Sequence, residues 1–328
     1  MPTDLDPVSV TDLVAQLAPG WRALRRVLHQ EPEIGMDLPD TQQRILDALE
    51  GIDVEITTGK ALSSVVGVIR GQAPHEGERP VVLLRGDMDA LPVTEAVDVP
   101  FVSQRPGVMH ACGHDLHVAG LVGAAQLLHA RRAELIGDVV LMFQPGEEGP
   151  GGAKPMIDEG LLTAAGRRVD AAYAVHVFSA EHPLGMWFGR PGTLMAAADE
   201  VVITVRGEGG HGAAPHRTLD PVPVACEIVL ALQAMVTRKF HAFDPVILTV
   251  GKIVAGTKNN IIGDTAILEL TVRTFSAEHR TKVLAEIERV AVGIASAHAM
   301  TAQLDRHDGY PATVNDPTEQ DFAEATIR

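Results

Sequence analysis

The chain has 328 residues, 46% hydrophobic and 21% charged, which is typical of a folded globular protein. At about 150 residues per domain, this length predicts more than one domain. There are 27 basic and 43 acidic residues, for a formal net charge of −16. This balance disfavours nucleic-acid binding and docking on anionic membranes, because both require a basic face.

Cysteine usage and the N-terminal segment indicate a cytoplasmic protein. Cys112 and Cys226 are the only cysteines, too few for a disulfide framework, which favours a reducing compartment. The acidic N-terminal segment lacks the basic and apolar regions of a signal peptide. No run of about 18 apolar residues, the length that spans a membrane, is present.

The first half of the chain alternates helical patterns with short apolar runs. Helices are expected over residues 9–30, where Pro19-Gly20 is expected to cause a break, and over 39–49, 116–132 and 153–163. Continuous apolar runs at 81–84 and 139–143 predict strands buried on both faces, and a third strand is expected at 171–175. The fold class is therefore α/β, with a mostly parallel sheet and helices on both faces.

The second half has a different order of elements. Strands are expected at 199–206, 245–252, 265–274 and 301–305, with helices at 220–238 and 276–299. This β-α-β-β-α-β order is typical of the ferredoxin-like split motif. We therefore expect one domain over residues 1–190 that resumes at 307–328, and an inserted α+β domain over 191–306.

Each predicted strand of the first domain is followed by groups that can bind metals. Asp87 and Asp89 follow the first strand, Glu147 and Glu148 the second, and His176 the third. Because functional groups gather at the carboxyl ends of strands in open α/β sheets, we expect these side chains to converge.

The segment HACGHDLH, residues 110–117, adds further candidate ligands. His110, Cys112 and His114 are spaced by two, so an extended backbone would direct all three to one side. Thiolate, imidazole and carboxylate groups suit zinc and neighbouring divalent metals. A catalytic Cys/His pair is the weaker alternative, because it leaves the glutamate pair without a task.

Adjacent glutamates in a partly buried loop repel each other, and a metal explains both. One carboxylate would ligate the ion, and the other would take a proton from a water that the ion activates.

Four motifs give these residues a family resemblance: RGDMDALP (85–92), HACGHDLH (110–117), FQPGEEGPGGA (143–153) and AVHVF (174–178). In this order and spacing they resemble the M20 metallopeptidases, and more narrowly the amidohydrolase branch that cleaves N-acyl-amino acids, hippurate and indole-acetyl-amino acids. The resemblance implies a two-metal catalytic domain and an inserted lid domain through which such proteins often form homodimers.

The resemblance also implies roles for the catalytic-domain residues. Cys112 would bridge two divalent ions (zinc, manganese, cobalt or nickel), with His114, Glu148 and His176 as further ligands. Glu147 would act as general base and later protonate the leaving amine.

Two aspartates and three lid residues complete the implied site. Asp89 would orient a ligand, and Asp87 would shape the same loop. His211, in GGHGAAPH (209–216), would stabilise the oxyanion, often from a partner subunit. Asn260 and Arg273 would hold the substrate carboxylate.

The implied function is metal-dependent hydrolysis of N-acyl-amino acids. A dipeptidase or aminopeptidase on the same scaffold is the alternative within this class. The family's catalytic domain supplies a final histidine ligand after the lid, whereas residues 311–328 contain no histidine. The chain is therefore expected to be truncated, and a catalytically inert dimerisation or binding module is the alternative from another class.

Overall fold

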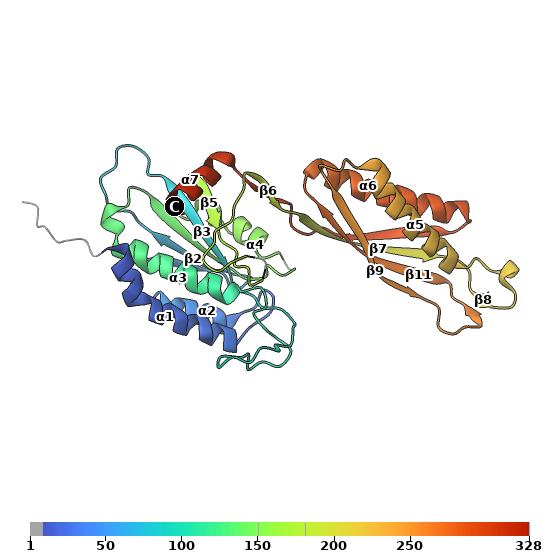
Figure 1. Ribbon diagram of the computed structural model, residues 1–328, viewed down its shortest axis with the longest axis horizontal. Helices are drawn as coiled ribbons and strands as arrows, with labels where there is room; N and C mark the ends of the chain where they lie inside the picture. The colour runs from blue at the N-terminus through green and yellow to red at the C-terminus, as the bar shows by residue number, and fades with distance from the viewer. Residues whose placement is uncertain (1–8, 150, 181, 328) are drawn as a thin grey trace, which may run out of the picture. The chain divides into compact units, whose positions relative to one another are not determined.

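The computed structural model describes residues 9–149, 151–180 and 182–327. It divides into two compact units, Met1–Met186 and Trp187–Arg328 (Figure 1). That residues 307–328 rejoin the first domain, with 191–306 as an insertion, stays a prediction.

The first unit is built on a five-stranded sheet with the order β1-β2-β4-β3-β5. Its strands are β1 (Glu55–Thr58), β2 (Val65–Ile69), β3 (Val81–Asp87), β4 (Asp138–Gln144) and β5 (Ala171–Ala174). β3 pairs parallel with β4 and with β5, whereas β1 with β2 and β2 with β4 pair antiparallel. The sheet is therefore mixed rather than mostly parallel. The sequence reasoning missed β1 and β2, which a short loop joins as an antiparallel hairpin.

Helices cover both faces of this sheet (Figure 1). α1 (Val10–Gln30), α2 (Pro39–Ala48) and α3 (His114–Ala130) pack on one face, and α4 (Ala153–Asp158) with the short helix η2 (Leu161–Thr163) packs on the other. Every residue of β4 is buried. Leu141 and Phe143 belong to the α1–α3 cluster, and Val140 and Met142 to the α4 cluster. This two-sided burial explains the continuous apolar run.

The expected break in the first helix is absent, because α1 continues through Pro19. Proline removes one backbone donor, but tertiary packing holds the helix in place. The Trp21 indole donates a hydrogen bond to Gln126 of α3 at 2.7 Å. The same ring lies so close to Gly123 that a Cβ there would be 3.1 Å away.

The second unit carries a four-stranded antiparallel sheet with the order β12-β7-β11-β9. Its elements are β7 (Ala197–Arg206), α5 (Pro221–Lys239), β9 (Val246–Ala255), β11 (Thr265–Thr274), α6 (Ala277–Ala297) and β12 (Thr301–His307). Their sequence, β-α-β-β-α-β, is that of the split motif. Buried residues of both helices, such as Ile228 and Ile287, form one core with the sheet.

The chain approaches and leaves this sheet along one two-stranded ribbon. β6 (Gly192–Met195) pairs antiparallel with β13 (Thr313–Asn315), ahead of the last helix α7 (Pro317–Ile327). The amide of Ala198 also donates to the carbonyl of Tyr310 at 3.2 Å. The four-stranded sheet with α5 and α6, here called the sheet module, therefore has its entry and exit segments side by side.

Helix α5 is the one candidate for a membrane span within the described part of the chain, by length and composition only. One side of it, including Val224, Ile228 and Leu232, is buried in the core of the second unit, as expected of a core helix.

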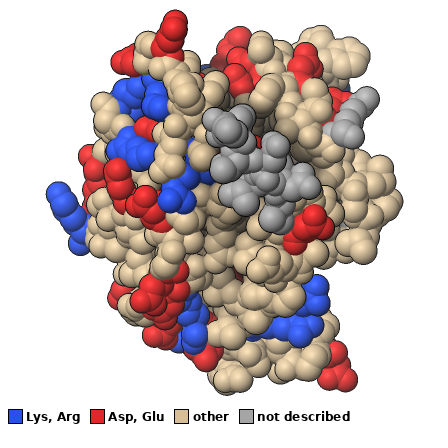
Figure 2. Space-filling model, turned by 90° about the vertical axis from the view of Figure 1, so that its left-hand side faces the viewer, with Lys and Arg blue, Asp and Glu red and all other residues tan. Residues whose placement is uncertain are grey.

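On the face shown in Figure 2, basic and acidic side chains lie interspersed rather than in a broad patch of either sign.

Candidate metal centre

The carboxyl ends of the central strands position the acidic groups. β3 ends at Asp87, with Asp89 two residues further on, and the turn with Glu147 and Glu148 follows β4. His176 follows β5, on the other side of β3. Because β3, β4 and β5 are mutually parallel where they pair, all these groups reach the same edge, as predicted from their positions at the carboxyl ends of the strands.

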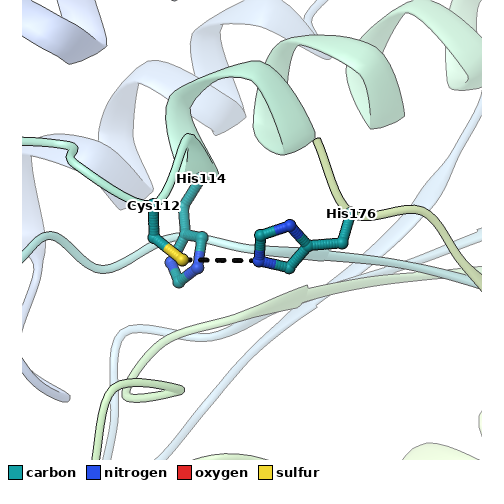
Figure 3. Close-up of side chains that lie close together, drawn as sticks. All are labelled: Cys112, His114 and His176. Carbon is teal, nitrogen blue, oxygen red and sulfur yellow. Dashed lines mark hydrogen bonds between the residues drawn. The ribbon is translucent and has the colours of Figure 1, made fainter. Parts of the chain in front are cut away.

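Cys112 and His114 reach this edge from the start of α3. Gly113 caps the helix with φ of 85°, a left-handed conformation that favours glycine. Donor atoms of Cys112, His114 and His176 all lie within 4.8 Å of one another (Figure 3). The Cys112 Sγ lies 3.3 Å from the His176 Nε2.

His114 belongs to a second group as well, since its donor atoms and those of Glu147 and Glu148 also lie within 4.8 Å of one another. The structure therefore brings all four predicted ligands and the predicted base around one fully buried imidazole. His110 lies outside these groups, because the chain turns into a helix at His114 instead of continuing as an extended strand.

Asp89 holds the glutamate turn in place. Its Oδ1 accepts a hydrogen bond from the Glu147 amide and its Oδ2 accepts one from the Glu148 amide, both at 2.9 Å. The same carboxylate lies 3.5 Å from the His114 Nδ1. One buried side chain thus fixes two strand exits and the helix start relative to one another.

The donor set fits a divalent cation. Both ring nitrogens of His114 and the Oε1 of Glu148 are buried, and neither residue satisfies these atoms with a hydrogen bond to the described residues. Burial lowers the pKa of His114, but interactions with Asp89 and Cys112 and the charge of Asp87 together raise it to about 11. The pocket therefore has a strong preference for positive charge, and sulfur, nitrogen and oxygen donors suit zinc and its neighbours.

Glu147 has the properties of a proton acceptor in this pocket. Burial and the nearby negative charges of Asp87 and Glu148 raise the pKa of Glu147 above its ordinary value. Its side chain remains 31% exposed. A partly open carboxylate with a raised pKa is a stronger proton acceptor than an ordinary glutamate.

A largely buried ionic network next to the candidate ligand His114 was not predicted from the sequence. Asp115, next to His114, contacts His29 at 2.7 Å and Arg25 at 2.8 Å, and His29 also contacts Glu95 at 3.1 Å. The hydrogen bond to Asp115 raises the pKa of His29. Nothing in the local sequence signals these partners, because they are far apart in the chain. His29 is 66 residues from Glu95 and 86 residues from Asp115, and Arg25 is 90 residues from Asp115.

The other three predicted site residues lie in the second unit. His211, in β8 (Gly210–His211), pairs with Ile261 of β10 (Ile261–Ile262), and the Gly212 amide donates to the Asn260 carbonyl at 2.9 Å. His211 and Asn260 line one surface depression. Arg273 is exposed near the opposite end of β11 and has no ion-pair partner among the described residues. The structure thus brings His211 and Asn260 together and separates Arg273 from both.

A mixed α/β scaffold with clustered thiolate, imidazole and carboxylate donors defines a metal-dependent hydrolase. The model of peptidase family M20/M25/M40 matches residues 83–328, and the chain belongs to this family. It is a metal-dependent amidohydrolase, acting on C–N amide bonds, as the resemblance implied.

Individual relatives agree with this assignment. The chain is 39% identical to thermostable carboxypeptidase 2 of Saccharolobus solfataricus over 302 residues, 91% of this chain and 75% of the relative. It is 37% identical to N-acetylcysteine deacetylase of Bacillus subtilis over 296 residues, 90% of this chain and 76% of the relative. Among solved structures, the YXEP protein of Bacillus subtilis, a dinuclear metal binding peptidase, is similar with a TM-score of 0.79, 33% identity, and coverage of 95% of this chain and 80% of that one.

Proposed function

We propose that the chain hydrolyses N-acyl-amino acids to a carboxylic acid and a free amino acid. The observation that carries the proposal is the convergence of Cys112, His114, Glu148 and His176 beside Glu147. The deacetylase relative supports an acylated amino acid as the substrate class, and the carboxypeptidase relative supports a peptide as the rival.

Cys112, His114, Glu148 and His176 would hold two divalent ions, with zinc, manganese, cobalt or nickel as the candidates. When bound, such ions polarise the amide carbonyl and lower the pKa of water. The unpaired buried atoms of His114 and Glu148 support this assignment, because buried polar groups otherwise find partners.

Glu147 would move the proton in both halves of the reaction. It takes a proton from the attacking water and delivers it to the nitrogen of the departing amino acid. Asp89 holds the Glu147 amide at 2.9 Å, so the base would stay in reach of the water.

His211 would donate a hydrogen bond to the oxyanion, and Asn260 and Arg273 would bind the substrate carboxylate. Arg273 stands eight positions along β11 from Thr265, the end nearest Asn260, which corresponds to about 26 Å of strand. An arginine side chain does not bridge that length. If both residues hold one carboxylate, they come from different copies of the chain. This supports a homodimer formed through the second unit as the lid.

The substrate test uses the full chain, loaded in turn with each of the four metals, and compares N-acetyl- and N-benzoyl-amino acids with dipeptides. Turnover of the blocked amino acids supports the proposal, and preference for a free amine supports the peptidase. Glu147→Gln is expected to reduce kcat by about 10²- to 10⁴-fold with metal content unchanged. Loss of metal would mean that Glu147 and Glu148 have exchanged roles. No turnover with any metal would favour the inert binding module.

Mixing two inactive variants tests the homodimer. Glu147→Gln and His211→Ala chains, unfolded together and refolded, form a mixed dimer with one intact site if His211 acts across the interface. Random pairing then restores about a quarter of the wild-type activity. No restoration would place His211 in its own chain's site, and a monomer in light scattering would exclude the shared site altogether.

A further inference from the structure

The backbone of Val177 lies between two histidines of the candidate site. Its carbonyl accepts a hydrogen bond from the His176 Nδ1 at 2.7 Å. Its amide donates to the His117 Nε2 at 2.9 Å. A backbone amide only donates, so the His117 Nε2 must carry a lone pair rather than a proton.

The other nitrogen of His117 completes the pattern. The His117 Nδ1 lies 2.5 Å from the Asp87 Oδ1, and the contact requires a donor, so the proton is on Nδ1. The other oxygen of Asp87, Oδ2, lies 2.8 Å from the Arg85 Nη1, and such an ion pair is formed by a carboxylate. Asp87 is therefore a carboxylate, and His117 is a neutral Nδ1–H tautomer.

This bonding excludes His117 as a metal ligand. Donor atoms of Asp87, His114 and His117 lie within 4.8 Å of one another and could be taken for a further metal site. Both ring nitrogens of His117 are already engaged, however, and a metal would have to displace the Val177 amide. The cluster has a different task.

We propose that His117 is a positioning residue that holds the Val177 peptide and, through it, the orientation of His176 toward Cys112. The Val177 carbonyl keeps the proton of His176 on Nδ1, which leaves the Nε2 lone pair directed at the Cys112 Sγ, 3.3 Å away. Such bonds fix the tautomer and orientation of a ligand histidine. The inference rests on the proposed function, because it assumes that Cys112 and His176 bind metal.

Two neighbouring contacts show that the Val177 position is tightly defined. The Val177 side chain fills the space beside Gly113, where a Cβ would lie 2.4 Å from the Val177 Cγ2. His117 stands three residues after His114 in α3, and their rings stack with centroids 5.5 Å apart. A shift of Val177 would therefore move His176 away from Cys112 and His114.

Two amide variants of His117 separate this role from packing. In His117→Gln, the longer side chain places its oxygen near the former Nε2 and can accept from Val177. In His117→Asn, the shorter side chain reaches Asp87 but not Val177. We expect Asn to weaken metal binding by about 10- to 100-fold and Gln to retain most of it. A histidine at the far end of α3, His129→Asn, is the matched control.

The assay is titration of the metal-free full chain with cobalt(II), following the thiolate-to-cobalt absorption that Cys112 produces. A wild-type chain without this absorption would refute the proposed function itself. Wild-type affinity in both His117 variants would refute only the positioning role, as would equal losses in Gln and Asn. Nitrogen-15 spectra of the histidine rings in the wild-type chain give an independent check, because a proton on the Nε2 of His117 or His176 would overturn the inference without any variant.

Discussion

The sharpest structural test of the site is Asp89→Asn, which preserves size and removes one acceptor. Asp89 is 1% exposed and accepts the amides of Glu147 and Glu148 at 2.9 Å each. Asparagine keeps one oxygen and turns an NH₂ group toward the second amide. One buried donor is then left without a partner.

The magnitude follows from these two bonds. An unsatisfied buried donor costs about 1–3 kcal/mol, and the remaining bond loses its charge assistance, roughly 1 kcal/mol more. The free energy of unfolding should therefore fall by about 2–4 kcal/mol. For a unit of this size, that corresponds to a Tm decrease of roughly 4–16 °C.

Thermal unfolding of the metal-free chain, followed by circular dichroism, measures this change. Asp170→Asn is the matched control, because Asp170 also accepts one backbone amide, from Val81, but its side chain is 45% exposed. We expect less than about 1 kcal/mol there. If Asp89→Asn unfolded within about 2 °C of the wild type, the two amide bonds would not organise the turn.

The remaining predictions concern the helix start, the buried network and the lid. Gly113→Ala combines a φ of 85° with a 2.4 Å contact to Val177, so cobalt affinity should fall at least tenfold, and unchanged affinity in the titration would contradict the geometry. The pKa of His29 is raised by Asp115, so its protonated form stabilises the fold fully below pH 6.5, the ordinary value, and less as pH rises through the folded-state pKa. The loss of stability in His29→Gln, measured by urea unfolding, should thus be larger at pH 6 than at pH 9. An equal loss of stability at both pH values would refute the raised pKa of His29. His211→Ala should lower kcat by about 10²-fold or more at unchanged metal content, and parallel loss of both would contradict a role confined to the oxyanion.

The strand exits were predictable because a fully buried strand produces an unbroken apolar run. β4 is such a strand, whereas β3 is partly buried and β5 is not, but Asp87, Glu147 and His176 each stand at the end of an apolar run, so their convergence could be expected from the sequence. β2 has the same kind of run, VVGVI, which the sequence pattern could equally have predicted as a strand.

Long-range packing was beyond the sequence patterns. Pro19 predicts a break in α1, yet the contact of Trp21 with α3 holds the helix intact. The task of His117 depends on the Val177 amide, which lies 60 residues away in the chain. Its one local signal is the spacing of three from His114, which places both on one face of a helix.

The ribbon of β6 and β13 has a mechanical consequence. Both crossings of the chain into the sheet module run through hydrogen-bonded, antiparallel segments, so neither can swivel alone as a single-stranded tether would. Rotation about the long axis of the ribbon must shear its ladder, whereas flexing across its thin direction leaves the ladder intact. A paired ribbon of this kind is thus expected to bend across its thin direction more readily than it twists.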